Sequence, residues 1–473
     1  NVKDAIPEIA SIVSQVNGMS IEEQKTEIQN NFPEILNVKE KPKAERVGLP
    51  PLEGAEHGKV VTRFTPAPNG YPHIGHAKAA IISEEYTKMY GGKIVLRFDD
   101  TNPDDTRLEY WAAIKVGLDW LGIKFDEEKN TSDDIELFYD KCMKMLKENS
   151  VYVCTCKRDT ISKNRKEMTS CKCSNGDVKQ NEDRWEKMFN KYKPGEAIVR
   201  FRGDMESKNT VMRDPVLFRI NDARHPRLVE KYRVWPSYDF AVAVEDYTDG
   251  ITHALRSKEY ELRNELYHAI LDALDMKHPK MMEFSRLEFK GMPVSKRVLR
   301  PLIDEGKVSG YDDPRLPTLE ALKRRGITSE AIRKFTLSLS LTKADTLAPF
   351  DSLEAFNRKI VDENSIRLFM VKDPRTLKIR NLPNSAVELP NHPSNKMGTR
   401  KVMIEDSVFL SSEDVKNLKI GDQLRLMGLG NVKIISINSE ILGEFTDDER
   451  NVNFMKLQWV SQKNAHELKI LIP

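Results

Sequence analysis

At 473 residues the chain is too long for a single hydrophobic core, and 39% hydrophobic with 31% charged residues is typical of a globular protein with several domains. No apolar run approaches the ~20 residues needed to cross a bilayer, and the N-terminus lacks a signal-type apolar stretch, so we expect a cytoplasmic protein with no membrane partner. A net charge of only +2 means that any nucleic-acid partner must be met by local basic surface. The missing initiator Met and the abrupt C-terminus indicate a fragment or an incompletely ordered chain.

The first part of the chain, residues 1–57, has the pattern of short amphipathic helices followed by a charged linker with prolines, which predicts a separable helical appendage. From Lys59 the pattern changes to a strand (KVVTRF), a turn, a helix from His76 to Tyr90 and a second strand (KIVLRF). This order predicts a βαβ unit with a parallel sheet, an architecture typical of nucleotide sites. We assign 58–105 to the first half of that domain.

Charged helices and clustered cysteines interrupt the alternation over 106–211, and strand and helix signals resume at VMRDPVLFRI and YDFAVAVED. This pattern predicts an insertion inside an α/β domain whose second half is 212–309. Helical segments with basic ends follow over 310–365. Short alternating strands then dominate 366–473 and predict β-barrel structure.

Four of the five cysteines fall in two Cys-x-Cys pairs, Cys154 with Cys156 and Cys171 with Cys173, inside one lysine-rich segment. Because a disulfide framework is unusual in a cytosolic protein, we interpret them as four thiolates for one structural, tetrahedral zinc ion. Four unrelated loop thiols are the alternative, since Cys-x-Cys is a less common ligand spacing than Cys-x-x-Cys.

The stretch TPAPNGYPHIGHAKAA places two histidines, His73 and His76, where the first strand's loop enters a helix. Backbone N–H groups and the helix N-terminus stabilise an anion at such a position. The histidines can donate hydrogen bonds to phosphate oxygens, and Gly75 leaves room for a purine or a phosphate to approach the backbone. Metal ligation or simple core packing is the alternative for these histidines.

A second basic loop lies far downstream, at Ser295, Lys296 and Arg297. Such a loop can close over a triphosphate, and a lysine ammonium suits oxygens whose negative charge grows as pyrophosphate leaves. A solvated basic loop is the alternative. With the histidines, these residues form the predicted ATP site.

These two stretches and four others follow the same order as in one enzyme family: RFTPAPNGYPHIGHAKAA, LRFDDTNP, NTVMRDPVLFR, YDFAVAVEDYTDGITHALRSKEY, SKR and VSGYDDPRLPTLEALKRRGI. Together they resemble the glutamyl and glutaminyl branch of the class I aminoacyl-tRNA synthetases. The resemblance implies a Rossmann catalytic domain, an inserted acceptor-end domain, a helical stem-contact region and two anticodon-binding β-barrels. The barrel-type C-terminus is similar to that of archaeal and eukaryotic glutamyl enzymes.

The amino-acid substrate is predicted from Arg256, whose position resembles an arginine of glutamyl enzymes and a neutral residue of glutaminyl ones. A guanidinium meets a carboxylate with two parallel hydrogen bonds, so Arg63 and Arg256 together favour glutamate. By resemblance, Asp99 binds the α-ammonium and Tyr238 hydrogen-bonds the substrate side chain. A helix-cap carboxylate and a core aromatic are the respective alternatives.

The resemblance implies ATP with Mg²⁺, glutamate and tRNA(Glu) as substrates, and a glutamyl-adenylate intermediate stabilised by His73, His76 and Lys296. We expect Arg315, Arg367 and Lys401 to contact the tRNA and the N-terminal appendage to bind a protein partner. Three other functions stay open: a glutaminyl-tRNA synthetase, a catalytically silent tRNA-binding relative, and a small-molecule nucleotidylyltransferase.

Overall fold

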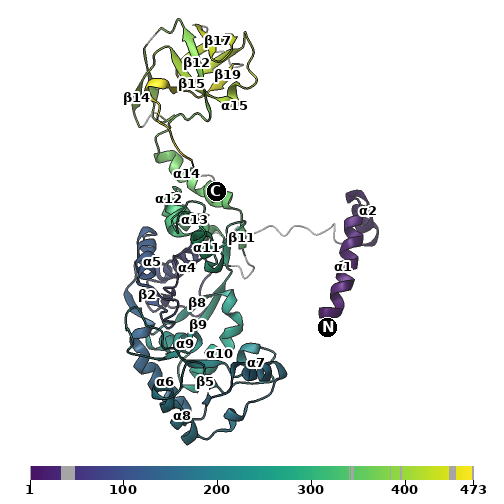
Figure 1. The fold of residues 1–473 in the computed structure, drawn as a ribbon, viewed down its shortest axis with the longest axis vertical. Coiled ribbons are helices and arrows are strands. Elements are labelled where there is room, and N and C mark those ends of the chain that lie inside the picture. Colours follow the sequence, from purple (N-terminus) through teal and green to yellow (C-terminus); the bar gives the residue numbers. More distant parts are fainter. Residues whose placement is uncertain are drawn as a thin grey trace. The chain divides into compact units, whose positions relative to one another are not determined.

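The chain is described by a computed structural model (Figure 1). Its described residues are 2–32, 48–339, 341, 346–383, 385–394, 397–446 and 454–470. They divide into two compact units, Asn1–Leu49 and Pro50–Pro473.

The N-terminal unit is a pair of helices, α1 (Val2–Gly18) and α2 (Ile21–Asn31), drawn in purple in Figure 1. Ser20 caps α2 through a capping box: the Glu23 N–H donates to Ser20 Oγ (3.3 Å), and the Ser20 N–H donates to Glu23 Oε2 (2.7 Å). One side of α1 carries exposed apolar side chains at helical spacing: Ile9, Ile12, Val13 and Val16. Within the described residues, no helix combines the length and apolarity that a membrane crossing requires.

The part of the chain predicted to be a Rossmann domain contains two short parallel sheets. One has the order β1-β2-β3 and the other pairs β8 with β9. Their bounds are β1 Val61–Phe64, β2 Lys93–Phe98, β3 Glu127–Asn130, β8 His253–Ser257 and β9 Lys280–Phe284. The central strands are nearly continuous buried runs, as expected for a parallel sheet covered on both faces.

Hydrogen bonds between the starts of β1 and β8 place these strands side by side. The Val61 N–H donates to Thr252 Oγ1 (2.8 Å), and the Thr252 N–H donates to the Val61 carbonyl (3.0 Å). Because both strands start at this edge, both end at the opposite edge. The strand order reverses between them, and ligands of such sheets bind in the crevice at the carboxyl ends.

Helices cover these sheets, and the first of them, α4 (Ile74–Tyr90), follows β1 as predicted from the sequence. It ends at Gly91, which has the left-handed φ of +58° of a helix C-cap. A Cβ on the next residue, Gly92, would lie 2.1 Å from the Val60 carbonyl oxygen, so the Gly-Gly pair allows β2 to begin beside β1. The other covering helices are α5 Leu108–Trp120, α9 Tyr238–Thr248 and α10 Asn264–Ala273, and α11 Lys296–Asp304 packs on the segment that follows it.

The predicted insertion contains a four-stranded antiparallel sheet, ordered β4-β5-β6-β7. Its strands and helices are β4 Val151–Cys154, β5 Ile198–Phe201, β6 Val216–Ile220, β7 Val234–Pro236, α6 Ile135–Lys147, α7 Arg158–Glu167 and α8 Val178–Asn190. The boundary expected at residue 211 falls inside this sheet, because β6 pairs with β5 instead of joining the parallel strands.

After the catalytic sheets comes a helical region with a parallel strand pair, β10 with β11. Its elements are β10 Leu287–Phe289, α12 Leu319–Arg324, α13 Ser329–Ser338, β11 Thr346–Ala348 and α14 Phe350–Asn364. Phe289 stacks on Phe335 and meets Phe350 edge-on, so these elements share one core with α4.

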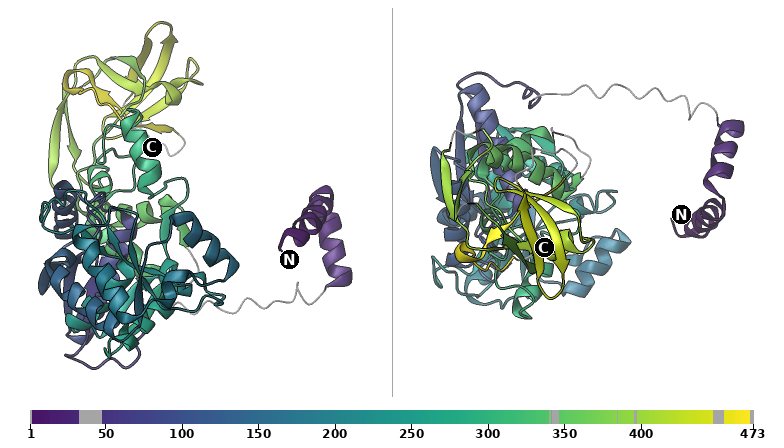
Figure 2. Two further views of the ribbon diagram at one scale, coloured as in Figure 1. Left: turned by 60° about the horizontal axis from the view of Figure 1, so that its bottom comes forward. Right: turned by 90° about the horizontal axis from the view of Figure 1, so that it is seen from above.

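The C-terminal region is a seven-stranded sheet, ordered β19-β16-β17-β18-β12-β15-β20, with a separate β13-β14 ribbon. The bounds are β12 Pro374–Arg380, β13 Ala386–Pro390, β14 Thr399–Met403, β15 Ser407–Ser411, α15 Ser412–Val415, β16 Gln423–Leu426, β17 Gly430–Ile437, β18 Ile441–Thr446, β19 Met455–Leu457 and β20 Val460–Ser461. Two residues, Gln458 and the buried Trp459, join the two edge strands, so the sheet curls until its edges meet (Figure 2).

This curled sheet and the α/β catalytic half confirm the predicted fold class. Where the resemblance implied two barrels, the described residues form one curled sheet and one two-stranded ribbon. Trp459 secures the curl, because its indole N–H donates to the Met427 carbonyl (3.0 Å).

Candidate active site

A cavity of about 350 Å³ opens at the carboxyl ends of β1, β2, β8 and β9, beside the start of α4. It is the crevice that the strand order predicts. The residues predicted for nucleotide and amino-acid binding that line it are Arg63, His73, Gly75, His76, Asp99, Tyr238 and Arg256.

The two histidines are held by the backbone of their own turn. The Gly75 N–H donates to His73 Nδ1 (3.1 Å), and the His73 N–H donates to His76 Nδ1 (3.2 Å). Burial lowers the pKa of His76 to about 4, and burial with the neighbouring His76 lowers the pKa of His73 well below its usual value. Both rings are therefore neutral at pH 7, and each carries its proton on Nε2, because Nδ1 accepts a hydrogen bond.

Gly75 allows another group to lie close to its backbone, and that group is the His73 side chain of the same turn. A Cβ at this position would lie 2.9 Å from His73 Cε1. The sequence suggested room for a nucleotide, whereas the structure shows that the glycine lets the His73 ring fold over the helix start.

The histidine turn is supported by the segment from Tyr311 to Leu319. The Leu319 N–H donates to the Pro72 carbonyl (2.9 Å), and the Ile74 N–H donates to the Pro317 carbonyl (3.2 Å). The ring of Tyr311 stacks on Tyr71 at a centroid distance of 4.3 Å. The sequence carried no signal for this support, since it joins stretches that lie more than 200 residues apart.

Arg256 is a buried cation on β8, with 4% of its surface exposed. Its guanidinium lies 5.1 to 5.9 Å from the ring centroids of Tyr238, Tyr260 and Tyr267. Nη1 donates to Asn264 Oδ1 (3.2 Å), and Nε is buried without a hydrogen-bond partner in the part of the chain that the structure describes. Among the described residues no carboxylate forms an ion pair with Arg256, so its charge is available to an anionic ligand.

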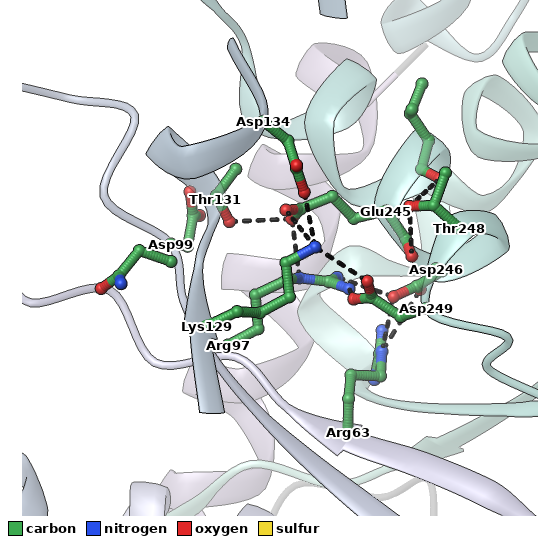
Figure 3. A network of polar contacts seen from close by, with 12 residues as sticks. Arg63, Arg97, Asp99, Lys129, Thr131, Asp134, Glu245, Asp246, Thr248 and Asp249 are labelled. Carbon is green, nitrogen blue, oxygen red and sulfur yellow. Dashed lines mark hydrogen bonds and ion pairs between the residues drawn. The ribbon is translucent and has the colours of Figure 1, made fainter. Parts of the chain in front are cut away.

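Arg63, at the end of β1, is already paired (Figure 3). Its Nε donates to both carboxylate oxygens of Asp246 (3.0 and 3.2 Å), and Nη1 donates to the Leu255 carbonyl (2.7 Å). The two arginines that the sequence presented as equivalent therefore differ. Asp246 forms an ion pair with Arg63, whereas no carboxylate of the described residues forms one with Arg256.

The two aspartates that follow β2 have separate environments. Asp99 lines the cavity, and burial together with the neighbouring Asp100 raises its pKa to about 6. Asp100 is turned away, because it accepts hydrogen bonds from the Ser132 N–H (2.8 Å) and hydroxyl (2.7 Å). Of these two aspartates, Asp99 is thus the one that a ligand in the cavity can reach.

The second predicted ATP segment begins α11. Ser295 is the N-cap residue of that helix, and Lys296 is its first residue; the Lys296 side chain lies outside what the structure describes. Arg297 does not line the active-site cavity. It lines an adjacent cavity of about 350 Å³ together with Arg300 and Tyr311.

The four predicted zinc ligands come together. Their sulfur atoms all lie within 4.8 Å of one another, and Cys154–Cys171 and Cys156–Cys173 are 3.7 and 3.8 Å apart. These separations are close to the ~3.8 Å edge of a tetrahedron with metal–sulfur bonds of about 2.3 Å. All four cysteines are free thiols, so the donor set fits a zinc ion.

The three predicted tRNA contacts lie in different settings. Arg315 is held by Asp313 through two hydrogen bonds of 2.8 Å each. Arg367 pairs with Asp362 at the surface, and its backbone N–H donates to the Asn391 carbonyl (2.8 Å). Lys401 is exposed on β14 of the ribbon.

Comparison with known proteins places this site in a family. Residues 59–363 match the family described as tRNA synthetases class I (E and Q), catalytic domain, and residues 365–452 match its anti-codon binding domain. The chain belongs to the class I tRNA synthetases for glutamate and glutamine. The sequence-based identification of this family is thereby confirmed.

Relatives within this synthetase family share most of the chain. It is 62% identical to the glutamate–tRNA ligase of Nitrosopumilus maritimus, over 100% of this chain and 83% of that protein. It is 40% identical to the glutamate–tRNA ligase of Thermococcus onnurineus, over 100% and 84% respectively. A crystal structure of a glutamate tRNA ligase from Elizabethkingia meningosepticum, in complex with its amino acid, covers 65% of this chain and 70% of its own at a TM-score of 0.50 and 18% identity, which shows the shared fold.

Proposed function

We propose that the protein attaches L-glutamate to tRNA(Glu) in an ATP-dependent reaction, through a glutamyl-adenylate. The single observation that carries the choice of glutamate is Arg256, a buried guanidinium in the cavity that forms no ion pair with a described carboxylate. The archaeal relatives, which are glutamate–tRNA ligases, support the same choice.

In the first step, an oxygen of the glutamate α-carboxylate attacks the α-phosphorus of ATP, and the bond to the bridging oxygen of pyrophosphate breaks. Negative charge grows on the phosphate oxygens, where the neutral Nε2–H groups of His73 and His76 donate hydrogen bonds. Lys296 adds a positive charge at the leaving pyrophosphate. Mg²⁺, bound by the phosphates, neutralises part of the ATP charge.

In the second step, a hydroxyl of the terminal tRNA ribose attacks the acyl carbon, and AMP leaves. The ammonium group of glutamate is held by Asp99, and its side-chain carboxylate by Arg63, Tyr238 and Arg256. The protein thus acts mainly by positioning its substrates and stabilising charge.

Glutamine is the closest competing substrate. Its amide is neutral, so it leaves the charge of the buried Arg256 uncompensated, whereas glutamate offsets that charge. The experiment that tests the proposed function is an aminoacylation assay that crosses glutamate and glutamine with tRNA(Glu) and tRNA(Gln). We expect efficient charging of tRNA(Glu) with glutamate; a preference for glutamine would overturn the proposal.

We expect the kcat/KM for glutamate to fall as the pH is lowered through about 6, because the ammonium group of the substrate binds the ionised form of Asp99. The pKa of Asp99 is raised in the folded protein, so its carboxylate is ionised above about pH 6 and protonated below it. From pH 7 to pH 5 this loss amounts to ~10-fold. Burial lowers the pKa of His76 to about 4 and the pKa of His73 well below its usual value, so Asp99 is the group expected to set the profile near pH 6.

The measurement is the pH profile of kcat/KM for glutamate at saturating ATP and tRNA. An Asp99→Asn variant provides the control, since it should have a low kcat/KM that no longer changes between pH 5 and pH 7. A wild-type profile that is flat across this range would contradict the role of Asp99.

We propose one structural zinc ion, held by Cys154, Cys156, Cys171 and Cys173, and supported by the spacing of their sulfur atoms. The Cys156→Ser variant should lose the metal and melt at a lower temperature, because a structural zinc stabilises the fold that binds it. Metal analysis and thermal unfolding test this expectation. Cys142→Ala is the matched control, since Cys142 lies in the hydrophobic core away from the cluster and its loss should leave one zinc per chain.

We also propose that Arg315, Arg367 and Lys401 contact tRNA and that the protein works in the cytoplasm. Arg367 and Lys401 are exposed, which supports a direct contact. The Arg315 guanidinium contacts tRNA either after it separates from Asp313 or through the N–H groups that Asp313 does not use. The apolar side of α1 supports the proposal that the N-terminal helices bind a protein partner.

We retain the predicted division of the chain as a proposal. In this division, the catalytic domain is 58–105 with 212–309 and the acceptor-end insertion is 106–211, except that the pairing of β6 with β5 and β7 moves β6 and β7 into the insertion. The stem-contact region is 310–365, and the anticodon-binding region is 366–473.

A further inference from the structure

Asp246 does not line the active-site cavity, but it contacts Arg63, which does. It also contacts Tyr267, whose ring lies beside the cavity residue Arg256. It lies on α9, fully buried, and is the carboxylate that holds Arg63. Figure 3 shows it between Arg63 and Arg97, in a cluster of charged side chains.

The contact with Arg63 fixes how that side chain is turned. Nε of Arg63 is used by Asp246, and Nη1 by the Leu255 carbonyl at the end of β8. With these two anchors on different nitrogens, the planar guanidinium has one orientation available. Arg63 is one of the residues that line the cavity, so this orientation sets which of its remaining N–H groups a ligand there can meet.

Asp246 also reaches the second arginine of the pocket, through a tyrosine. The Tyr267 hydroxyl donates to Asp246 Oδ2 (2.9 Å), and the Tyr267 ring centroid lies 5.3 Å from the Arg256 guanidinium. Tyr267 is almost fully buried, so its hydroxyl depends on this hydrogen bond. The Asp246 carboxylate therefore holds Arg63 directly, and it acts on Arg256 through the ring of Tyr267.

Asp246 is itself secured from the other side. Nη2 of Arg97 donates to Asp246 Oδ1 (2.7 Å), while Arg97 also pairs with Glu245 (2.7 Å) and Asp249 (2.5 Å). Burial alone would raise the pKa of Asp246, but Arg63 and Arg97 outweigh it and hold the pKa below its usual value. The carboxylate is thus ionised and fixed at neutral pH.

We propose that Asp246 is a positioning residue of the amino-acid pocket, which orients Arg63 and, through Tyr267, Arg256 for the side-chain carboxylate of the substrate. The proposal rests on glutamate as the substrate. It goes further by placing part of the substrate selectivity in a residue that the substrate does not touch.

The test compares two isosteric variants of the full chain, Asp246→Asn and Asp249→Asn. Each removes one buried carboxylate from Arg97, but only Asp246 contacts Arg63 and Tyr267. For Asp246→Asn we expect the KM for glutamate to rise ~10-fold or more, with kcat at saturating glutamate and the KM for ATP changed by less than ~3-fold. For Asp249→Asn we expect a glutamate KM within ~2-fold of the wild type.

Equal changes of the glutamate KM in the two variants would overturn the proposal, because both would then report a loosened fold. A wild-type glutamate KM in a folded Asp246→Asn variant would also overturn it. If thermal unfolding shows that Asp246→Asn does not fold, Tyr267→Phe decides: it keeps the ring and loses the hydroxyl, so a glutamate KM raised ~2- to 5-fold supports the proposal, and an unchanged value overturns it.

These outcomes are separable from a failure of the proposed function. The wild-type preference between glutamate and glutamine tests the substrate, whereas the comparison of Asp246→Asn with Asp249→Asn tests the positioning role for whichever of the two the wild type charges.

Discussion

A His76→Ala variant is expected to form glutamyl-adenylate ~10²- to 10³-fold more slowly than the wild type, because it lacks a preorganised donor to the phosphate oxygens. In the structure His76 Nδ1 accepts the His73 N–H, so the proton on Nε2 is available to the substrate. The lost contact forms where charge develops in the transition state, so kcat should fall more than the affinity for ATP.

The measurement is single-turnover formation of the adenylate in the presence of tRNA, with tRNA affinity measured separately. A useful control is His278→Ala, which removes a histidine that lies outside the cavity and pairs with Asp272. It should leave adenylate formation unchanged. If His76→Ala forms the adenylate about as fast as the wild type, His76 does not assist the reaction and only packs in the turn.

The second large effect is expected at Arg256. An Arg256→Cys variant should lose about one to three powers of ten in selectivity for glutamate over glutamine, mainly through lost glutamate activity. The structure strengthens this expectation, because Asp246 offsets the charge of Arg63 and leaves Arg256 as the cation whose charge a glutamate carboxylate can compensate. Conversion to a glutaminyl enzyme is not expected, since Arg63 and Tyr238 are unchanged.

Pyrophosphate exchange in the presence of tRNA, measured with each amino acid, determines this selectivity. The conservative Arg256→Lys variant separates charge from geometry: it keeps the cation but loses the planar fork, so its selectivity should fall between the other two. Full retention of the glutamate preference in Arg256→Cys would show that another group recognises the side-chain carboxylate.

Much of the site could be predicted because its residues lie in short, local patterns. The strand, turn and helix around the two histidines were predicted within two residues of β1 and α4, since a short apolar strand pattern and a turn with three prolines and two glycines specify them locally. The four cysteines were predicted to converge from spacing alone, and their sulfur atoms do lie together.

What the sequence left open depends on contacts between distant segments. Asp246 reads as an ordinary acidic residue of the helix YDFAVAVED, and only the packing of α9 brings it to Arg63, 183 positions away. The strand β6 was assigned to the catalytic half because its apolar pattern is the same for either sheet. Its pairing with β5 is a property of the folded chain.

The hydrogen bonds between the histidine turn and the segment before α12 have a consequence for local opening. The amide protons of Ile74 and Leu319 are bonded across the two segments, to Pro317 and Pro72, so neither segment can fray without freeing an amide of the other. The two should therefore exchange hydrogen with solvent as one cooperative unit. A bound nucleotide that slows hydrogen exchange at Ile74 should therefore slow it at Leu319 as well. Nucleotide binding then orders both segments in one step, with one loss of conformational entropy.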